Sequence, residues 1–256
     1  MTGLLPSFDL TDKIALVTGA ARGLGHSCAL ALANAGADIA IGLRDINSGN
    51  DLVAEIENLG KKVFPVQMDV SKMREINEAV EKVHSHFGQI DILVNNVGVA
   101  PESPAESVSE SIFDEIIDIN IKGTFFVTQA VGKHMILQKS GRIINISSQA
   151  GFVSLPDETL YCVSKAAINH LTKCLAVEWA KYNINVNAVA PTFIHTPGTE
   201  PYLSDNKNLE TVLSNIPLGR IGEPSEVSGA VVFLASPAAS LITGEVMLID
   251  GGWTSK

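Results

Sequence analysis

The feature that most constrains the fold is a short apolar run that leads straight into a glycine-rich turn and then into a helix. The run Ile14–Val17 predicts a buried parallel strand. The segment Thr18–Gly25 follows with the glycine spacing G-x-x-x-G-x-G, and the helical stretch after it ends near Gly36. Glycines let a backbone approach phosphate groups closely, and a helix N-terminus offers amide donors and a favourable dipole. The order of strand, turn and helix therefore indicates a site for a dinucleotide pyrophosphate.

Similar apolar runs recur along the chain and alternate with stretches of helical periodicity. The runs are Ile14–Val17, Ile39–Ile41, Val63–Val66, Ile92–Val94, Ile143–Ile146, Val186–Val189 and Val246–Ile249. The helical stretches include Leu52–Leu59, Ile76–Phe87, Phe113–Met135 and Ile168–Ala180. Gly36, Gly60 and Gly88 stand at expected helix ends, where a left-handed residue is needed. The alternation predicts an α/β domain with a parallel sheet, right-handed crossovers and helices on both faces.

Composition and charge exclude several classes of protein. Of the 256 residues 46% are hydrophobic, but no apolar run approaches the roughly 18 residues of a membrane span. The segment Met1–Phe8 lacks the features of a signal peptide, so we expect a soluble, cytoplasmic protein. The net charge of −10 argues against nucleic acid as a partner. Three cysteines without C-x-x-C spacing and six dispersed histidines indicate neither a disulfide framework nor a metal site.

A candidate acid–base pair lies in the segment Leu160–Lys165. Tyr161 and Lys165 are four residues apart and so share one face of a helix, and Ser148 lies thirteen residues before Tyr161. An ammonium beside a phenol favours the phenolate and lowers the phenol pKa from about 10 toward neutrality. A tyrosine tuned in this way can exchange a proton with an alcohol oxygen near pH 7. A tyrosine at the edge of the core beside a solvated lysine would show the same spacing, so the pair depends on its context.

Taken together, the motifs resemble those of the classical short-chain dehydrogenase/reductase family, from about Leu10 to Trp253. The matching elements, in order, are Thr18-Gly19-x-x-x-Gly23-x-Gly25, Asp69-Val70, Asn95-Asn96-Val97-Gly98, Asn120, Ser148, Tyr161 with Lys165, Asn187-Ala188-Val189-Ala190-Pro191 and Gly251-Gly252. The resemblance implies a single Rossmann-type domain over residues 1–256, with a doubly wound seven-stranded parallel sheet and a substrate loop at about 192–215. It also implies a homotetramer or homodimer, which fits the largely apolar helices at 113–135 and 168–179. Val97 stands where alanine is commoner in the family and adds volume beside the cofactor.

The resemblance also implies a chemistry, namely reversible hydride transfer between a nicotinamide and a carbonyl or alcohol carbon. Tyr161 would exchange a proton with the substrate oxygen, Lys165 would lower its pKa and bind the nicotinamide ribose, and Ser148 would hydrogen-bond the substrate oxygen. Asn120 would hold a water molecule in a proton relay to Lys165. Ser147 competes with Ser148, but the interval to Tyr161 matches the family's active serine for Ser148. No metal ion is implied.

The end of the second strand helps to distinguish NAD from NADP. An acidic residue there binds the ribose 2′-hydroxyl, while a nearby arginine accommodates the 2′-phosphate of NADP. Aligned with the family, the acidic position is Leu43, Arg44 follows, and Arg22 in the glycine turn could clamp the same phosphate. We therefore expect NADP(H), with NAD(H) as the alternative if Arg44 pairs with Asp45 in solvent or Asp45 turns toward the ribose. The expected cofactor-binding residues are Gly19, Arg22, Gly23, Leu24, Gly25, Arg44, Asp69, Val70, Asn96, Gly98, Tyr161, Lys165, Pro191, Ile194 and Thr196.

The substrate is a small carbonyl compound or alcohol in this interpretation. The segments Ser147–Gln149, Tyr161-Cys162 and Pro191-Thr192 resemble the branch that contains xylulose reductases and polyol dehydrogenases, which implies a ketose or a sugar alcohol. Thr192 stands where most family members have glycine. The expected substrate-binding residues are Ser148, Gln149, Glu158, Tyr161 and His195.

Three alternatives remain open. Glu158 and His195 could be solvated loop residues. The enzyme could be a 3-oxoacyl-thioester reductase of fatty-acid synthesis, although the acidic charge balance disfavours docking of an acidic carrier protein. The chain could also be a non-catalytic NADP-binding regulator, an alternative that the presence of all four expected catalytic residues disfavours.

Overall fold

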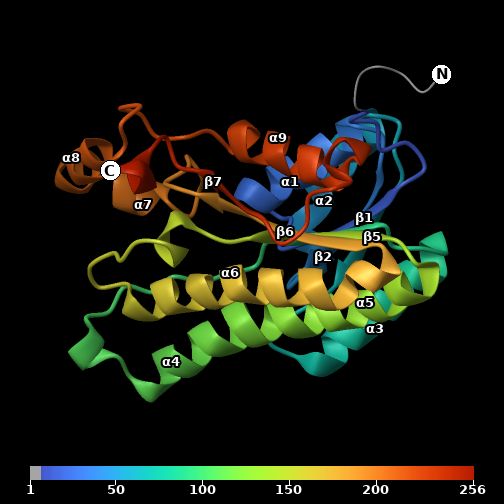
Figure 1. Cartoon of the computed structure of the whole chain (residues 1–256), viewed down its shortest axis with the longest axis horizontal. Coiled ribbons are helices and arrows are strands. Elements are labelled where there is room, and N and C mark those ends of the chain that lie inside the picture. Colours follow the sequence, from blue (N-terminus) through green and yellow to red (C-terminus); the bar gives the residue numbers. More distant parts are fainter. Residues whose placement is uncertain (1–6) are drawn as a thin grey trace.

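A sheet of seven parallel strands forms the centre of the computed structural model, which describes residues 7–256 (Figure 1). The strands are β1 (Ile14–Thr18), β2 (Asp38–Leu43), β3 (Val63–Gln67), β4 (Ile92–Asn95), β5 (Gly141–Ile146), β6 (Ile184–Pro191) and β7 (Val246–Ile249). Their order across the sheet is β3-β2-β1-β4-β5-β6-β7. The strand order reverses between β1 and β4, and such a switch point is where open α/β sheets bind ligands. The predicted doubly wound, seven-stranded sheet is confirmed.

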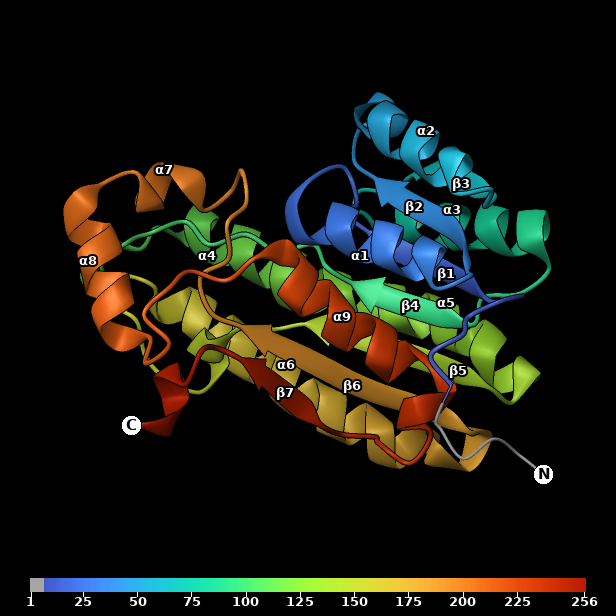
Figure 2. The same ribbon diagram turned by 90° about the horizontal axis from the view of Figure 1, so that it is seen from above.

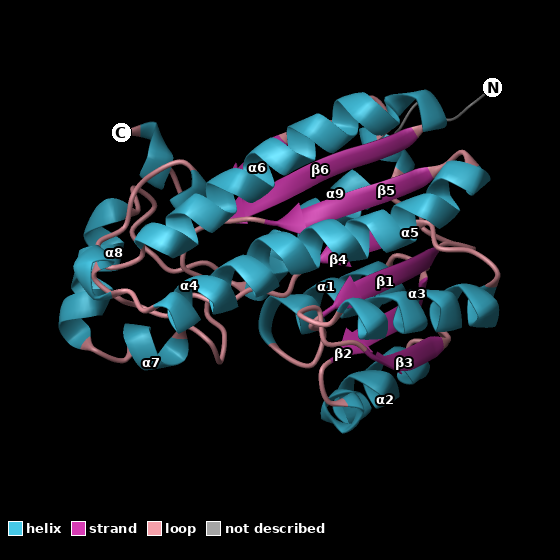
Figure 3. Cartoon of the chain, turned by 90° about the horizontal axis from the view of Figure 1, so that it is seen from below, coloured by secondary structure: helices cyan, strands magenta, loops and turns pink. Residues whose placement is uncertain are grey.

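Helices cover both faces of the sheet. The α-helices of the described residues are α1 (Gly23–Asn34), α2 (Asn50–Asn58), α3 (Met73–Phe87), α4 (Glu110–Ile116), α5 (Thr124–Gln138), α6 (Thr159–Trp179), α7 (Glu200–Leu203), α8 (Asn206–Asn215) and α9 (Pro224–Ala235). The short 3-10 helices are η1 (Ile46–Gly49), η2 (Ala105–Ser107), η4 (Gln149–Gly151), η5 (Ala180–Tyr182), η6 (Pro237–Ala239) and η7 (Trp253–Ser255). Helices α1, α2 and α9 pack on one face (Figure 2), and α3, α5 and α6 pack on the other (Figure 3).

The strands are buried on both faces, which explains why their sequences are continuous apolar runs. In β1, Val17 packs with residues of α1, α2 and α9, while its neighbour Leu16 packs with residues of α3, α5 and α6. Both side chains are fully buried. Successive side chains of a strand point to opposite faces, so a strand covered on both sides shows no alternation of apolar and polar residues.

The expected helical stretch Phe113–Met135 is helical throughout but not a regular α-helix, because a π-helical segment, η3 (Ile117–Gly123), joins α4 to α5. This segment contains Asn120, which is 1% exposed. It ends at Gly123, where a Cβ would lie 2.9 Å from the carbonyl oxygen of Val70. Short π segments inside α-helices occur frequently at functional sites. Apolar residues continue through this segment, so hydrophobic periodicity could not reveal it.

The predicted substrate loop, residues 192–215, contains α7 and α8 and lies beyond the carboxyl ends of the strands (Figure 2). Aromatic stacking ties this segment to the C-terminal end of the chain. The Phe193 ring stacks on Tyr202 with a centroid distance of 5.5 Å and on Trp253 with a centroid distance of 6.0 Å. The segment therefore forms a structured wall over the carboxyl edge of the sheet.

Within residues 7–256, the structure contains no helix that combines the length and apolar character needed to cross a membrane. Apolar side chains are nevertheless exposed on α5 and α6, among them Phe125 at 38% and Val177 at 84%. Exposed apolar surface of this kind is typical of interaction sites when it is contiguous. The homotetramer or homodimer stays a prediction.

A glycine on α5 lets this helix pack closely against α6. A Cβ on Gly132 would lie 2.5 Å from the nearest ring carbon of Trp179. We therefore expect Gly132→Ala to lower the free energy of unfolding by about 1–3 kcal/mol, the usual effect of overpacking a core. Urea denaturation followed by circular dichroism measures the change.

Gly229→Ala is the matched control for this substitution. Gly229 lies in α9, where a Cβ would meet nothing within 4 Å. The alanine should therefore raise stability by about 0.5–1 kcal/mol through its better helix propensity. Equal effects of the two substitutions would contradict the close packing of α5 on α6.

Candidate active site

The turn between β1 and α1 leaves backbone amides free. Gly19 and Gly23 have φ angles of +64° and +59°, in the left-handed region that glycine adopts most easily. Arg22 is the N-cap residue of α1, yet its side chain makes no capping hydrogen bond, and the first turn carries no acidic side chain. A helix N-terminus with free N–H groups and the positive end of its dipole stabilises a bound phosphate.

Gly25, the third glycine of the motif, allows close packing. A Cβ on Gly25 would lie 2.5 Å from both Nδ2 of Asn96 and the carbonyl oxygen of Gly19. Nδ2 of Asn96 in turn donates hydrogen bonds to the carbonyl oxygens of Thr18 and Gly19, each at 3.1 Å. Gly25 and Asn96 therefore fix the shape of the turn.

Two cavities adjoin along this turn. The first, of about 400 Å³, lies between the turn, α6 and the chain after β6. The second, of about 440 Å³, lies beside the carboxyl ends of β2 and β3. Gly19, Arg22, Val97 and Val99 line both, so the cavities form one elongated space across the switch point. Every predicted cofactor-binding residue except Gly25 lines one of the two.

The second cavity contains charged groups of both signs, but its two carboxylates already have partners. Oδ1 of Asp45 accepts the backbone N–H of Asn47 at 3.0 Å and so caps η1. Asp69 accepts hydrogen bonds from Ser71 and forms an ion pair with Lys72 at 3.2 Å. Within the described part of the chain, neither carboxylate is paired with an arginine.

The two arginines of this cavity, in contrast, have no polar partner for their side chains. The main-chain carbonyl of Arg44 accepts a hydrogen bond from Gln67. The guanidinium groups of Arg44 and Arg22, however, contact no hydrogen-bonding or acidic partner within residues 7–256. Leu43, at the position where the family has its acidic residue, is buried in the core. The end of β2 therefore offers free positive charge and no carboxylate directed at a ligand.

The three predicted catalytic side chains meet at the first cavity. Oγ of Ser148 accepts the N–H of Ala150 at 3.1 Å, which leaves the serine hydroxyl proton free to be donated. Tyr161 and Lys165 lie one turn apart on α6, with Nζ 5.6 Å from the centroid of the tyrosine ring. Nζ also donates a hydrogen bond to the carbonyl oxygen of Ile146 at 2.9 Å. The predicted convergence of these groups is thus present in the geometry.

Two further polar residues anchor α6. Oγ of Ser147 donates to the side chain of Asn169, so this serine is bound to α6. Nδ2 of Asn120 donates to Oγ of Ser164 at 2.9 Å and to the carbonyl oxygen of Val99 at 2.9 Å. Oδ1 of Asn120 accepts the N–H of Val99 at 2.8 Å. Both N–H groups of the Asn120 amide therefore have protein partners, while Oδ1 accepts one hydrogen bond, and the part of Asn120 in a water relay stays a prediction.

The pKa of Tyr161 in the protein alone is raised, not lowered toward neutrality as expected. Burial raises the pKa of Tyr161 to about 12, which outweighs a lowering by a hydrogen bond with Ser148. Burial also lowers the pKa of Lys165 to about 8. The low-polarity surroundings disfavour the charged form of each group. At pH 7 Tyr161 therefore holds its proton.

A third cavity, of about 180 Å³, adjoins the first along residues that include Ser148, Tyr161 and Thr192. Gln149 lines it and is 1% exposed, yet neither atom of its amide has a partner within residues 7–256. Oγ1 of Thr192 is likewise buried without a partner in that range. A buried polar group without a hydrogen bond costs about 1–3 kcal/mol. Such groups around one cavity indicate a ligand that carries hydroxyl or carbonyl groups.

Two carboxylic acids also line the third cavity, Glu158 at the start of α6 and Glu102 from the chain after β4. Burial, and to a smaller extent the nearby Glu102, raises the pKa of Glu158 to about 7. At neutral pH Glu158 is therefore divided between its neutral and its charged form.

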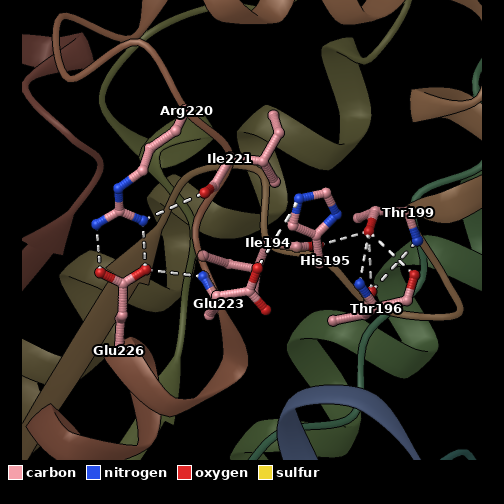
Figure 4. Close-up of polar contacts among 8 residues, drawn as sticks. All are labelled: Ile194, His195, Thr196, Thr199, Arg220, Ile221, Glu223 and Glu226. Carbon is pink, nitrogen blue, oxygen red and sulfur yellow. Dashed lines mark hydrogen bonds and ion pairs between the residues drawn. The ribbon is translucent and has the colours of Figure 1, made fainter.

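His195, which was expected to contact substrate, lines none of the three cavities. Its Nε2 lies 4.0 Å from Oε1 of Glu223, and its side chain is 48% exposed (Figure 4). The cause is local, since the N–H of His195 donates to the carbonyl oxygen of Gly222 and so turns this segment toward α9. The structure therefore separates His195 from the other expected substrate residues.

A bidentate ion pair near His195 fixes the start of α9. Arg220 contacts Glu226 at 2.8 and 2.6 Å, and Glu226 also accepts the N–H of Glu223 at 2.8 Å (Figure 4). This network holds the chain after the substrate loop, and among residues 7–256 its hydrogen bonds reach no predicted catalytic residue.

Sequence reasoning did not assign Thr192 or Glu102 to the third cavity. Thr192 had a usable signal, because a hydroxyl residue stands where most family members have glycine. Glu102 had none, because it lies in an irregular segment without periodicity. Tyr202 also lines this cavity, and only the path of the chain after β6 could place it there.

The fold and these groups define an oxidoreductase of the dinucleotide-binding class. The family model described as enoyl-(acyl carrier protein) reductase matches residues 19–254. The 3-oxoacyl-[acyl-carrier-protein] reductase FabG of Thermotoga maritima is 45% identical over 245 residues, covering 95% of this chain and 98% of that protein. The NAD-dependent glycerol dehydrogenase of Listeria innocua is 41% identical over 255 residues, covering 99% and 98%.

A solved structure gives the same result. The gluconate 5-dehydrogenase of Burkholderia cenocepacia, crystallised with NADP and tartrate, has a TM-score of 0.95 at 33% identity, covering 99% of this chain and 100% of that chain. The chain belongs to the classical short-chain dehydrogenases/reductases, and it is an enzyme that acts on CH–OH groups. The alternative of a non-catalytic regulator is thereby set aside.

The raised pKa of Glu158 predicts a pH dependence of stability. The pKa is about 7 in the folded protein against 4.5 for the free side chain, so the folded state binds the proton more tightly. Stability contributed by this group is present below about pH 4.5 and is lost as the pH rises through about 7. Glu102 is the charged group that acts on Glu158, and Glu158 in turn helps to raise the pKa values of Tyr161, Cys162 and Tyr202.

Replacing Glu158 by Gln should remove this loss. Urea denaturation should show Glu158→Gln gaining stability relative to the parent protein between pH 5 and pH 8. The gain is on the order of 1 kcal/mol, because solvent screens the partly exposed group. Glu106→Gln, an exposed acidic residue outside the cavities, should show no such change. A gain that is the same at both pH values would contradict the raised pKa.

Proposed function

We propose that the protein is an NADP(H)-dependent enzyme that interconverts the carbonyl and alcohol of a small hydroxylated substrate, a ketose or polyol. The observation that carries this proposal is the position of Ser148 and Tyr161. Both line the first cavity, which suits a nicotinamide, and both line the third cavity, which contains unpaired polar groups. The hydroxyls that would handle the substrate oxygen therefore face both spaces. Residues 192–215 form the substrate loop in this proposal.

The preference for NADP(H) rests on charge at the end of β2. Arg22 and Arg44 line the second cavity with free guanidinium groups, and two or more positive charges suit a 2′-phosphate. Asp45 is engaged as a helix cap, which disfavours its use for an NAD ribose. The pyrophosphate fits the free amides at the start of α1. The gluconate 5-dehydrogenase neighbour crystallised with NADP supports the same choice.

The nicotinamide would supply or accept the hydride, and the chain's own residues handle the proton. In the direction of reduction, Tyr161 donates its proton to the carbonyl oxygen, and Ser148 donates a hydrogen bond to the same atom. The high pKa of Tyr161 keeps this proton in place at pH 7. Lys165 is held by Ile146 and keeps further N–H groups free for the ribose hydroxyls. Its positive charge favours the phenolate that remains after proton transfer.

The proposal of a ketose or polyol as substrate rests on Gln149 and Thr192. The amide can both donate and accept hydrogen bonds, and the hydroxyl can do the same. The glycerol dehydrogenase relative acts on a small polyol, as its name states.

A second candidate function is the reduction of a 3-oxoacyl thioester on a carrier protein. The observation in its favour is the 45% identity with the reductase of Thermotoga maritima. The net charge of −10 and the two carboxylic acids at the third cavity disfavour an acidic carrier protein. Initial rates of NADPH and NADH oxidation, measured with ketoses from erythrulose to sorbose and with an acetoacetyl thioester, separate the two functions. Turnover of the thioester alone would contradict the polyol proposal.

Tyr161→Phe removes the proposed acid while keeping the ring. We expect kcat to fall by at least about 100-fold, the usual contribution of general acid–base catalysis. NADPH binding, followed by quenching of protein fluorescence, should change less than about threefold. Retained turnover would contradict the role of Tyr161, whereas lost cofactor binding would indicate a structural defect.

Arg44→Asp should reverse the charge offered to the 2′-phosphate. We expect kcat/KM for NADPH to fall by about 100-fold and kcat/KM for NADH to change by less than about tenfold. Arg74→Asp on α3 is the matched control, because Arg74 is 86% exposed and lines neither cofactor cavity. Equal losses with NADPH and NADH would contradict the preference for NADP(H).

A further inference from the structure

We propose that Glu102 and Glu158 form an acidic wall that excludes anionic substrates, so that the enzyme acts on uncharged ketones and alcohols and rejects sugar acids and sugar phosphates. This inference rests on the proposed function and narrows its substrate class by charge. It concerns the third cavity, in which both carboxylic acids face the same space as Ser148 and Tyr161.

The charge of this cavity is one-sided. Among the described residues that line it there are two glutamates and no lysine, arginine or histidine. The nearest positive group of the catalytic set is Lys165, which lines the first cavity instead and donates to the carbonyl oxygen of Ile146. A carboxylate or phosphate on the substrate would therefore meet no cationic partner in the third cavity.

The two carboxylic acids act on the same groups from different elements. Glu102 belongs to the chain after β4, and Glu158 belongs to the start of α6. After burial, Glu102 contributes to the raised pKa of Glu158, and both acids contribute to the raised pKa of Tyr202, which also lines the cavity. Their fields therefore overlap across the space that a substrate would occupy.

The size of the expected discrimination follows from Coulomb's law. Two like charges several ångströms apart near a protein surface weaken binding by about 10- to 100-fold. A polyol or ketose carries no charge and can use the same acids as hydrogen-bond partners. Glu158 accepts hydrogen bonds when ionised and can donate one when protonated. The acidic wall should therefore weaken the binding of an anionic substrate strongly and the binding of a neutral substrate only slightly.

The test compares two ketones that differ by one charge. L-sorbose and 5-keto-D-gluconate share the carbon skeleton, the position of the ketone and the configuration, but one ends in CH₂OH and the other in a carboxylate. Rates of NADPH oxidation with the holoenzyme give kcat/KM for each at pH 8. We expect a ratio of at least about 10 in favour of sorbose. The ratio should be smaller at pH 6, where more Glu158 is protonated.

Substitutions assign the discrimination to the two acids. Glu102→Gln combined with Glu158→Gln should lower the ratio by about tenfold. Glu102→Lys, at an exposed position that tolerates change, should raise kcat/KM for the keto acid by about tenfold. Glu106→Gln is the matched control, since Glu106 is exposed nearby and lines none of the three cavities. It should leave the ratio unchanged.

The outcomes separate this inference from the proposed function. Two outcomes would contradict the acidic wall and leave the proposed function unaffected. In the first, the parent enzyme reduces the keto acid as well as it reduces sorbose. In the second, the double substitution leaves the ratio unchanged. If neither these two ketones nor any ketose of the wider panel is reduced, the proposed function fails and this inference fails with it.

Discussion

The close approach of α6 to the chain that leaves β5 is the constraint on which the rest of the site depends. A Cβ on Gly151 would lie 2.5 Å from Nδ2 of Asn169 and 2.9 Å from the carbonyl carbon of Lys165, so only glycine fits there. This contact brings the chain after β5, which carries Ser148, against the helix that carries Tyr161. Oγ of Ser147 also donates a hydrogen bond to Oδ1 of Asn169 on α6. Two segments remote in sequence are thereby held as one rigid catalytic surface.

The sheet could be predicted from the sequence because strands that are buried on both faces appear as continuous apolar runs. The strand that contains Ile14–Val17 is buried at every residue, so its side chains are apolar on both faces of the sheet. The alternation of such strands with helices limits the number of possible sheet topologies. The sequence was sufficient for the convergence of Ser148, Tyr161 and Lys165 because their motifs resemble those of a known family. It failed for the pKa of Tyr161, because desolvation depends on everything packed around a group and not on the residue four positions away. It also failed for Glu102 and His195, whose directions are set by irregular chain and by contacts remote in sequence.

The three cavities differ in the charged groups that line them. The cavity at the end of β2 has free arginine side chains, and the cavity at the substrate end has two carboxylic acids. Between them lies a region in which burial keeps Tyr161 protonated and lowers the pKa of Lys165. An elongated ligand with an anionic end and a neutral, hydroxylated partner matches this polarity in one orientation. In the proposed function, electrostatics as well as shape therefore favour one orientation of cofactor and substrate.

The π-helical segment between α4 and α5 has a consequence for how this protein could change over evolution. A π turn is equivalent to one residue inserted into an α-helix. Because each residue rotates an α-helix by about 100°, deleting that residue would swing everything beyond it around the axis by more than a quarter turn. Within the segment Asn120 holds α6 and the chain after β4, and beyond the segment Gly132 meets Trp179. The contacts of Asn120 and of Gly132 thus require a particular rotation between the two parts of the helix. An insertion or deletion of one residue between them would change that rotation and break one of the two contacts.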